Sequence, residues 1–173
     1  YRRQRQMCIR DRLVNQQLAK MLFANPQRID YYDRYQEIID AYNAEQNRAT
    51  IEKTFMDLME LASSLDTEQQ RYVREGFSSD EELSVYDLLF SENLTKQEIE
   101  TIKKVSVDLL TKIKQQIAKL DHWTDEQETK AIVDNLIRNT LWQELPNSYD
   151  VSDIQTYQKK IYEYVYMRYS EVA

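Results

Sequence analysis

Residues 75–90, EGFSSDEELSVYDLLF, contain the only glycine of the 173-residue chain. Glycine reaches positive φ at little cost, so Gly76 is suited to end the helix that precedes it. Ser79 lies three residues before Glu82, which is the spacing of a capping box at the start of a helix. The stretch therefore predicts a structural joint at Gly76 between two helices, and the rest of the chain has to pack around this joint.

The scarcity of residues that break regular structure decides the fold class. The chain has one glycine and two prolines, whereas the turns of a sheet depend on Gly, Pro, Asn and Asp. Long segments therefore run without interruption, and their apolar residues recur at helical spacing. The sequence predicts an all-α, irregular helical bundle of about seven helices with no sheet.

Pairs of the type [ST]-x-x-[EQ] mark the expected helix starts. Five such pairs precede periodic apolar runs: Thr67 with Gln70, Ser79 with Glu82, Thr95 with Glu98, Thr124 with Gln127, and Ser152 with Gln155. The helix before the first pair is expected to end near Leu65. Another helix is expected to end before Asn25 and Pro26, because proline disfavours the helical conformation in the residue before it.

Residues 1–12, YRRQRQMCIRDR, differ in composition from everything that follows. The segment has five arginines and a single acidic residue, Asp11. Its run QMCIRDR resembles a translated sequencing adapter. We therefore expect residues 1–12 to be a non-native leader, residues 13–75 a first helical layer and residues 76–173 a C-terminal helical domain. An arginine-rich nucleic-acid arm and a targeting leader are the alternatives for the first segment.

Several classes of site are excluded by composition. A phosphate-binding loop needs several glycines, and an ordinary Cys/His zinc site needs more than Cys8 and His122. A net charge of −7 argues against a role of this chain as the primary nucleic-acid-binding surface. No apolar run reaches the length of about 18 residues that would suggest a membrane span. The sequence predicts no catalytic, cofactor-binding or metal-binding residue, and a cytoplasmic location.

Thirteen tyrosines are the unusual feature, and they concentrate in residues 31–42 and 157–169. Tyrosine offers a large, stiff contact surface with a polar tip, which favours interfaces. The candidate partner-binding residues are those of the last helix: Tyr157, Tyr162, Tyr164, Tyr166 and Tyr169. The alternatives are phenols that line the polar edge of a core, or rings that stack on nucleic-acid bases, which the acidic surroundings disfavour.

Three stretches share the order and spacing of one known family: NPQRIDYYDRYQEIIDAYN at 25–43, EGFSSDEELSVYDLL at 75–89, and HWTDEQETKAIVDNLIRNTLWQELPNSYD at 122–150. The matching positions are Asn25, Pro26, Arg28, Tyr42, Asn43, Glu81, Glu82, Leu83, Tyr86, Asp87, Trp123, Leu145, Pro146 and Tyr149. Together they resemble the C-terminal helical region of the restriction (R) subunit of type I restriction-modification enzymes. The resemblance covers nearly all of residues 13–173.

The resemblance implies that the complete subunit is a bacterial ATP-dependent DNA translocase and endonuclease, with ATP and Mg as cofactors of domains upstream of this region. It also implies that this region docks the motor subunit on the methyltransferase and specificity subunits, with DNA bound by the whole complex. The alternative is a regulatory element of the motor that contacts DNA or nucleotide through Lys103, Lys104, Lys112 and Lys114. On a helix these lysines are first expected to form a solvated face.

The chain by itself is expected neither to hydrolyse ATP nor to cut DNA, because no stretch can cradle a triphosphate. Phosphate release from ATP and nicking of a plasmid, each compared with a buffer blank, check this. Turnover above the blank in either assay would overturn it.

Overall fold

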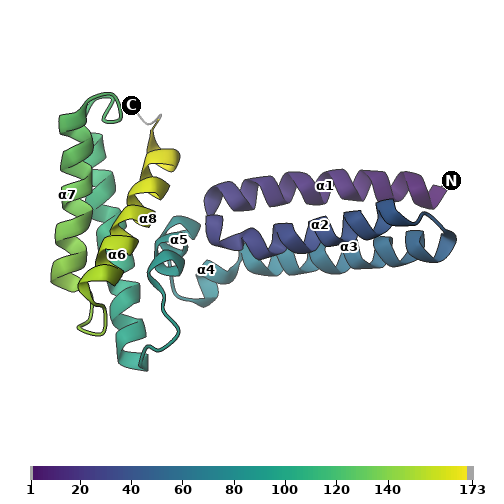
Figure 1. Cartoon of the computed structure of the whole chain (residues 1–173), viewed down its shortest axis with the longest axis horizontal. Helices are drawn as coiled ribbons and strands as arrows, with labels where there is room; N and C mark the ends of the chain where they lie inside the picture. Colours follow the sequence, from purple (N-terminus) through teal and green to yellow (C-terminus); the bar gives the residue numbers. More distant parts are fainter. Residues whose placement is uncertain (1, 171–173) are drawn as a thin grey trace. The chain divides into compact units, whose positions relative to one another are not determined.

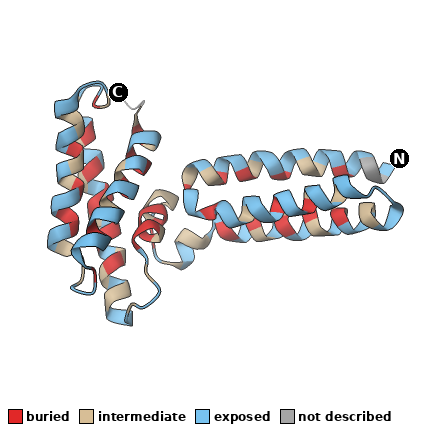
Figure 2. Cartoon of the chain, in the orientation of Figure 1, coloured by how far each residue is buried: buried red, intermediate tan, exposed pale blue. Residues whose placement is uncertain are grey.

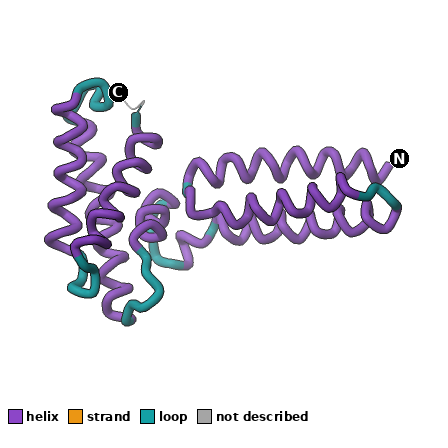
Figure 3. Tube along the Cα trace, in the orientation of Figure 1, coloured by secondary structure: helices purple, strands orange, loops and turns teal. Residues whose placement is uncertain are grey.

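The computed structural model describes residues 2–170, apart from the side chains of Arg3 and Gln4. The described part contains eight α-helices, one short 3-10 helix and no strand (Figure 3). This confirms the all-α prediction. The chain divides into two compact units, the first ending at Gly76 and the second beginning at Phe77, and each is described by itself.

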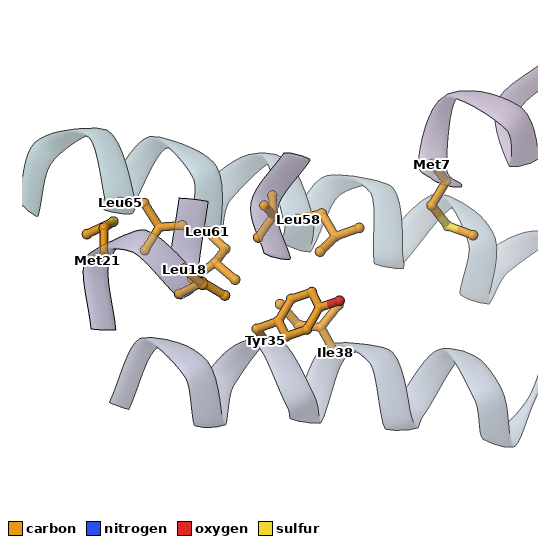
Figure 4. Close-up of a cluster of buried hydrophobic side chains, with 9 residues drawn as sticks. Met7, Leu18, Met21, Tyr35, Ile38, Leu58, Leu61 and Leu65 are labelled. Carbon is orange, nitrogen blue, oxygen red and sulfur yellow. The ribbon is translucent and has the colours of Figure 1, made fainter. Parts of the chain in front are cut away.

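Unit 1 is built on one long central helix. Its elements are α1 (Arg2–Ala24), the 3-10 helix η1 (Pro26–Arg28), α2 (Ile29–Ala44), α3 (Arg48–Gln69) and α4 (Arg71–Arg74). The helix α3 packs along both α1 and α2 (Figure 1). Figure 4 shows the resulting core, in which Leu58, Leu61 and Leu65 of α3 meet Leu18 of α1 and Tyr35 of α2. The spacing of three and four residues along α3 keeps its apolar side chains on one face.

Residues 2–12 form the first part of α1, which runs without a break to Ala24. Met7 is 3% exposed and repeats the buried spacing of Val14 and Met21, seven residues apart. The hydroxyl of Tyr35 donates to Oδ1 of Asp11 at 2.5 Å. The segment set apart by composition therefore takes part in the packing of unit 1. Its assignment as a non-native leader, and the domain limits drawn from it, stay predictions.

Unit 2 is a ring of four helices. They are α5 (Asp80–Leu89), α6 (Lys96–Ala118), α7 (Gln127–Glu144) and α8 (Val151–Tyr169). Each helix packs against the next, and α8 closes the ring against α5 (Figure 1). Buried positions follow the inner face of the helices in Figure 2. The apolar side chains with no exposed surface are Leu83, Val85, Leu89, Ile102, Leu109, Ile113, Val133, Ile137, Leu141, Ile161 and Val165.

Two of the predicted capping pairs are confirmed. Ser79 precedes α5, and its side chain accepts a hydrogen bond from the backbone N–H of Glu82 at 3.3 Å. Thr95 and Glu98 form a complete capping box at the start of α6, in which each side chain accepts from the other residue's backbone. The two helices on either side of residues 90–95 therefore begin where the sequence predicts.

The prediction of a helix start at Thr67 is wrong, as is the expected helix end near Leu65. The helix α3 continues to Gln69, and the Thr67 hydroxyl donates to the carbonyl of Ser63 at 3.1 Å. A threonine inside a helix commonly bonds the carbonyl four residues back in this way. The helix continues because Glu68, one turn beyond the apolar stripe, is buried and has charged partners that are described below.

The predicted starts at Thr124 and Ser152 are also wrong. The N-cap of α7 is Glu126, which makes no side-chain capping bond. The N-cap of α8 is Asp150, whose carboxylate forms a capping box with Asp153. Aspartate is as good a cap as serine, and Asp150 comes two residues earlier.

The joint at Gly76 has the predicted conformation. Gly76 has φ of +86°, and its N–H donates to the carbonyl of Val73 at 3.1 Å, just beyond the end of α4. A Cβ atom built on Gly76 would meet no other atom within 4 Å. The cost of a side chain at this position therefore comes from the backbone conformation alone.

Replacing Gly76 by valine is expected to lower the free energy of unfolding by about 1–2 kcal/mol, because a β-branched residue is strained at positive φ. Gly76→Asn is the matched control, since asparagine tolerates this region better and should cost less. Urea unfolding followed by circular dichroism measures both. Equal stability of the valine variant and the parent would show that the position carries no strain.

Candidate partner-binding site

The Asn25-Pro26-x-Arg28 motif forms the turn between α1 and α2. Asn25 has the extended conformation expected before proline, with φ of −147°, and its Oδ1 accepts from the N–H of Gln27 at 3.1 Å. Both Asn25 and Arg28 are buried, at 0% and 3% exposure. The turn thereby directs a guanidinium into the interior of unit 1.

The charge of Arg28 is balanced by Glu68 of α3. Nε of Arg28 donates to Oε1 of Glu68 at 3.2 Å, and Nε of Arg71 lies 3.0 Å from both carboxylate oxygens. The hydroxyl of Tyr31 also donates to Glu68, at 3.5 Å. Burial, and then the charge of Glu68, raise the pKa of Tyr31, so its phenol remains a donor. Removing one member of a buried ion pair leaves an unpaired charge, so this motif fixes the fold of unit 1.

Glu81 connects three helices of unit 2. Its carboxylate, in the first turn of α5, accepts from the hydroxyl of Tyr169 at 2.6 Å and from Nζ of Lys114 at 2.5 Å. The guanidinium of Arg168 lies 3.7 Å away. Burial alone would raise the pKa of Glu81, but the hydrogen bonds and positive charges of these partners outweigh it and lower that pKa. Glu81 therefore stays charged and joins α5 to α6 and α8.

Trp123 fastens the end of α8 to the loop before α7. The indole is 1% exposed, and its Nε1 donates to the backbone carbonyl of Tyr169 at 3.0 Å. The rings of Tyr162 and Tyr166 meet the indole edge-on, with centroids 6.2 and 5.8 Å away. The preceding His122 is exposed and has φ of 44°, so it belongs to the turn that orients the tryptophan.

Tyr149 closes unit 2 from the loop between α7 and α8. Its hydroxyl donates to the carbonyl of Leu89 at 2.5 Å, and its ring packs edge-on against Tyr157 at 5.5 Å. Burial is the main cause that raises the pKa of Tyr149, so the phenol keeps its proton. Leu83 and Tyr86 of α5 are also buried. The residues of the family motifs described here thus make contacts inside their own unit and stabilise its fold.

The five candidate tyrosines of α8 do not share one environment. Tyr164 and Tyr169 are buried at 5% and 8% exposure, so they are not available to a partner. Tyr157 and Tyr162 are half-buried, and Tyr166 is 39% exposed. The rings of Tyr164 and Tyr169 are covered because α8 packs against both α7 and α5.

One of the remaining tyrosines, Tyr162, lines a groove that the sequence did not predict. This groove between α7 and α8 encloses about 510 Å³ and is lined by Gln127, Lys130, Ala131, Asp134, Gln155, Gln158, Lys159 and Tyr162. Nε2 of Gln158 donates to Oδ1 of Asp134 across it at 3.1 Å. Beside Tyr162 lies Tyr166, whose ring centroid is 6.2 Å away, and Met167 next along the helix is 73% exposed. We call Tyr162 and Tyr166 the aromatic surface.

Three of the four lysines considered for DNA contact are engaged by other side chains. Lys112 lies 2.9 Å from Asp108 and 3.7 Å from Glu144, and Lys114 is bound to Glu81. Lys103 lies over the ring of Tyr86 at 5.9 Å. These lysines therefore balance acids of unit 2 and cover an aromatic ring.

Within residues 2–170, as far as the structure describes them, no group of His, Cys, Asp and Glu side chains has the arrangement of a metal site. Over the same residues no helix is both long and apolar enough to cross a membrane.

A protein-family model described as type I restriction enzyme HindI endonuclease subunit-like, C-terminal, matches residues 5–170. The match spans almost the whole chain and confirms the resemblance predicted from the three motifs. No curated protein and no solved structure matches the chain.

Replacing Glu81 by glutamine is expected to lower the free energy of unfolding at neutral pH by about 1–3 kcal/mol, because three donors lose a charged acceptor. A lowered pKa means that this stabilisation is complete above the ordinary pKa of glutamate and is lost as the pH falls through the lowered value. The difference between variant and parent should therefore shrink on acidification.

Urea unfolding across that pH range measures the effect, with the exposed Glu92→Gln as control, expected within about 0.5 kcal/mol of the parent. A difference that stays constant with pH would show that the Glu81 charge does not stabilise the fold.

Proposed function

Because this chain belongs to the family of C-terminal regions of type I restriction enzyme HindI endonuclease-like subunits, we propose that it is the helical assembly domain of such a subunit. In this proposal it docks the motor subunit on the methyltransferase and specificity subunits. The observation that carries the proposal is the aromatic surface, which is exposed on unit 2, whereas Glu81, Trp123 and Tyr149 of the family motifs make contacts inside that unit.

The aromatic surface has the properties of a binding hot spot. Tyr166 is 39% exposed, and its ring packs against that of Tyr162 with centroids 6.2 Å apart. The buried indole of Trp123 holds both tyrosine rings edge-on. Tyrosines that are fixed before binding lose little conformational entropy when a partner covers them, which favours affinity.

The proposal assigns the chemistry to other regions of the complete subunit. That subunit would be a cytoplasmic bacterial DNA translocase and endonuclease, with ATP and Mg bound by its motor and nuclease domains. DNA would be held by the assembled complex.

The alternative of direct DNA contact through α6 has less support. Lys112 and Lys114 are paired with carboxylates, so they have little positive charge to offer to phosphates. Lys104 remains on the surface, and a single lysine is a weak phosphate site.

Changing Tyr162 and Tyr166 together to alanine, in the full subunit, is expected to weaken assembly by about 1–3 kcal/mol for each hot-spot ring. The measurement is co-purification of the variant subunit with the methyltransferase and specificity subunits, with ATPase activity as evidence that the motor is intact. A melting curve excludes general unfolding.

Tyr32→Ala on α2 is the matched control, since Tyr32 is 37% exposed and so resembles Tyr166 in accessibility. It should leave co-purification unchanged. Normal assembly of the α8 variant, together with a loss in the Tyr32 variant, would move the interface to the tyrosine-rich helix α2.

A further inference from the structure

The groove between α7 and α8 is lined by two lysines. Lys130 and Lys159 line it, and within the described residues neither makes an ion pair. Asp134, the acid of the same groove, accepts a hydrogen bond from Gln158. With two lysines against one aspartate, the lining of the groove carries a net charge of +1, whereas Lys112 and Lys114 elsewhere in unit 2 are paired with carboxylates.

This positive groove belongs to an acidic chain. The net charge of the chain is −7, so a positive groove is a local exception that favours negatively charged groups. Unpaired lysines at the rim of an interface act mainly on the rate of association and on the choice of partner.

The other lining groups suit a polypeptide. Gln127, Gln155 and Gln158 offer side-chain amides, which both donate to carbonyls and accept from N–H groups of a backbone. Burial raises the pKa of Tyr162 at the edge of the groove, so its phenol stays a neutral donor. A volume of about 510 Å³ leaves room for a few side chains of an inserted segment.

We propose that the α7–α8 groove binds an acidic segment of a partner protein, with Lys130 and Lys159 pairing with its carboxylates. The inference rests on the proposed assembly function and names the chemistry of the partner: Glu- and Asp-rich chain on the methyltransferase–specificity core. The adjoining aromatic surface supplies the apolar part of the same interface.

A nucleic acid is the less favoured occupant. Affinity for DNA grows with the number of phosphates neutralised, and two lysines on an acidic chain neutralise few. The amide groups of the groove also match a peptide backbone better than a row of phosphates.

The direct test titrates the chain with a synthetic glutamate-rich peptide, a lysine-rich peptide of equal length and a short DNA duplex, followed by backbone amide NMR shifts. The glutamate-rich peptide is expected to shift residues of α7 and α8 at the groove. The double change Lys130→Glu and Lys159→Glu should weaken its binding by about tenfold or more. Lys104→Glu with Lys119→Glu, two exposed lysines of α6 and its C-cap, is the matched control and should leave binding unchanged.

Absence of groove shifts with the glutamate-rich peptide would overturn the inference, as would equal weakening by the control pair or tighter binding of the duplex. Circular dichroism of each variant shows whether it is folded. The two proposals can fail independently. If the Tyr162 and Tyr166 variant loses assembly but no peptide binds, the docking role is supported and only the acidic segment is rejected.

Discussion

The carboxylate of Glu81 is the contact on which unit 2 depends most. It sits in the first turn of α5 and binds groups from α6 and from the end of α8, so one charge closes a ring of four helices. Its position near the amino end of a helix is itself favourable for a negative charge. Trp123 reinforces the same corner by holding the backbone carbonyl of Tyr169.

Unit 1 uses a similar arrangement with different residues. Glu68 lies near the end of α3 and accepts from Arg28 and Arg71, which come from the turn before α2 and from α4. A buried carboxylate with two guanidinium partners is costly to desolvate, but it fixes the register of the elements that supply its donors. In both units a glutamate near a helix end sets how the helices meet, while leucines and isoleucines fill the space between them.

This organisation explains why the residues of the family motifs do not indicate a catalytic or binding function. Arg28, Glu81, Trp123 and Tyr149 are all occupied by contacts inside their own unit. Partner recognition then falls to side chains that the scaffold displays, namely the aromatic surface and the lysines of the neighbouring groove. Such a division lets a scaffold stay constant while its displayed residues change with the partner.

The sequence by itself determined the all-α class, the positive φ of Gly76 and the helix starts at Ser79 and Thr95, because these depend on local backbone energetics. It also predicted the family, through residues whose order along the chain is enough to identify them. It did not predict that α3 runs through Thr67, since Glu68 is stabilised by Arg28, forty residues away in the chain.

Only the tertiary structure decided which tyrosines of α8 are exposed to solvent. Tyr164 and Tyr166 are two residues apart, yet one is buried at 5% and the other is 39% exposed. Helical periodicity places them on different faces, but it cannot tell that α8 is covered by both α5 and α7. The groove with Lys130 and Lys159 arises for the same reason: it exists only where the consecutive helices α7 and α8 pack against each other.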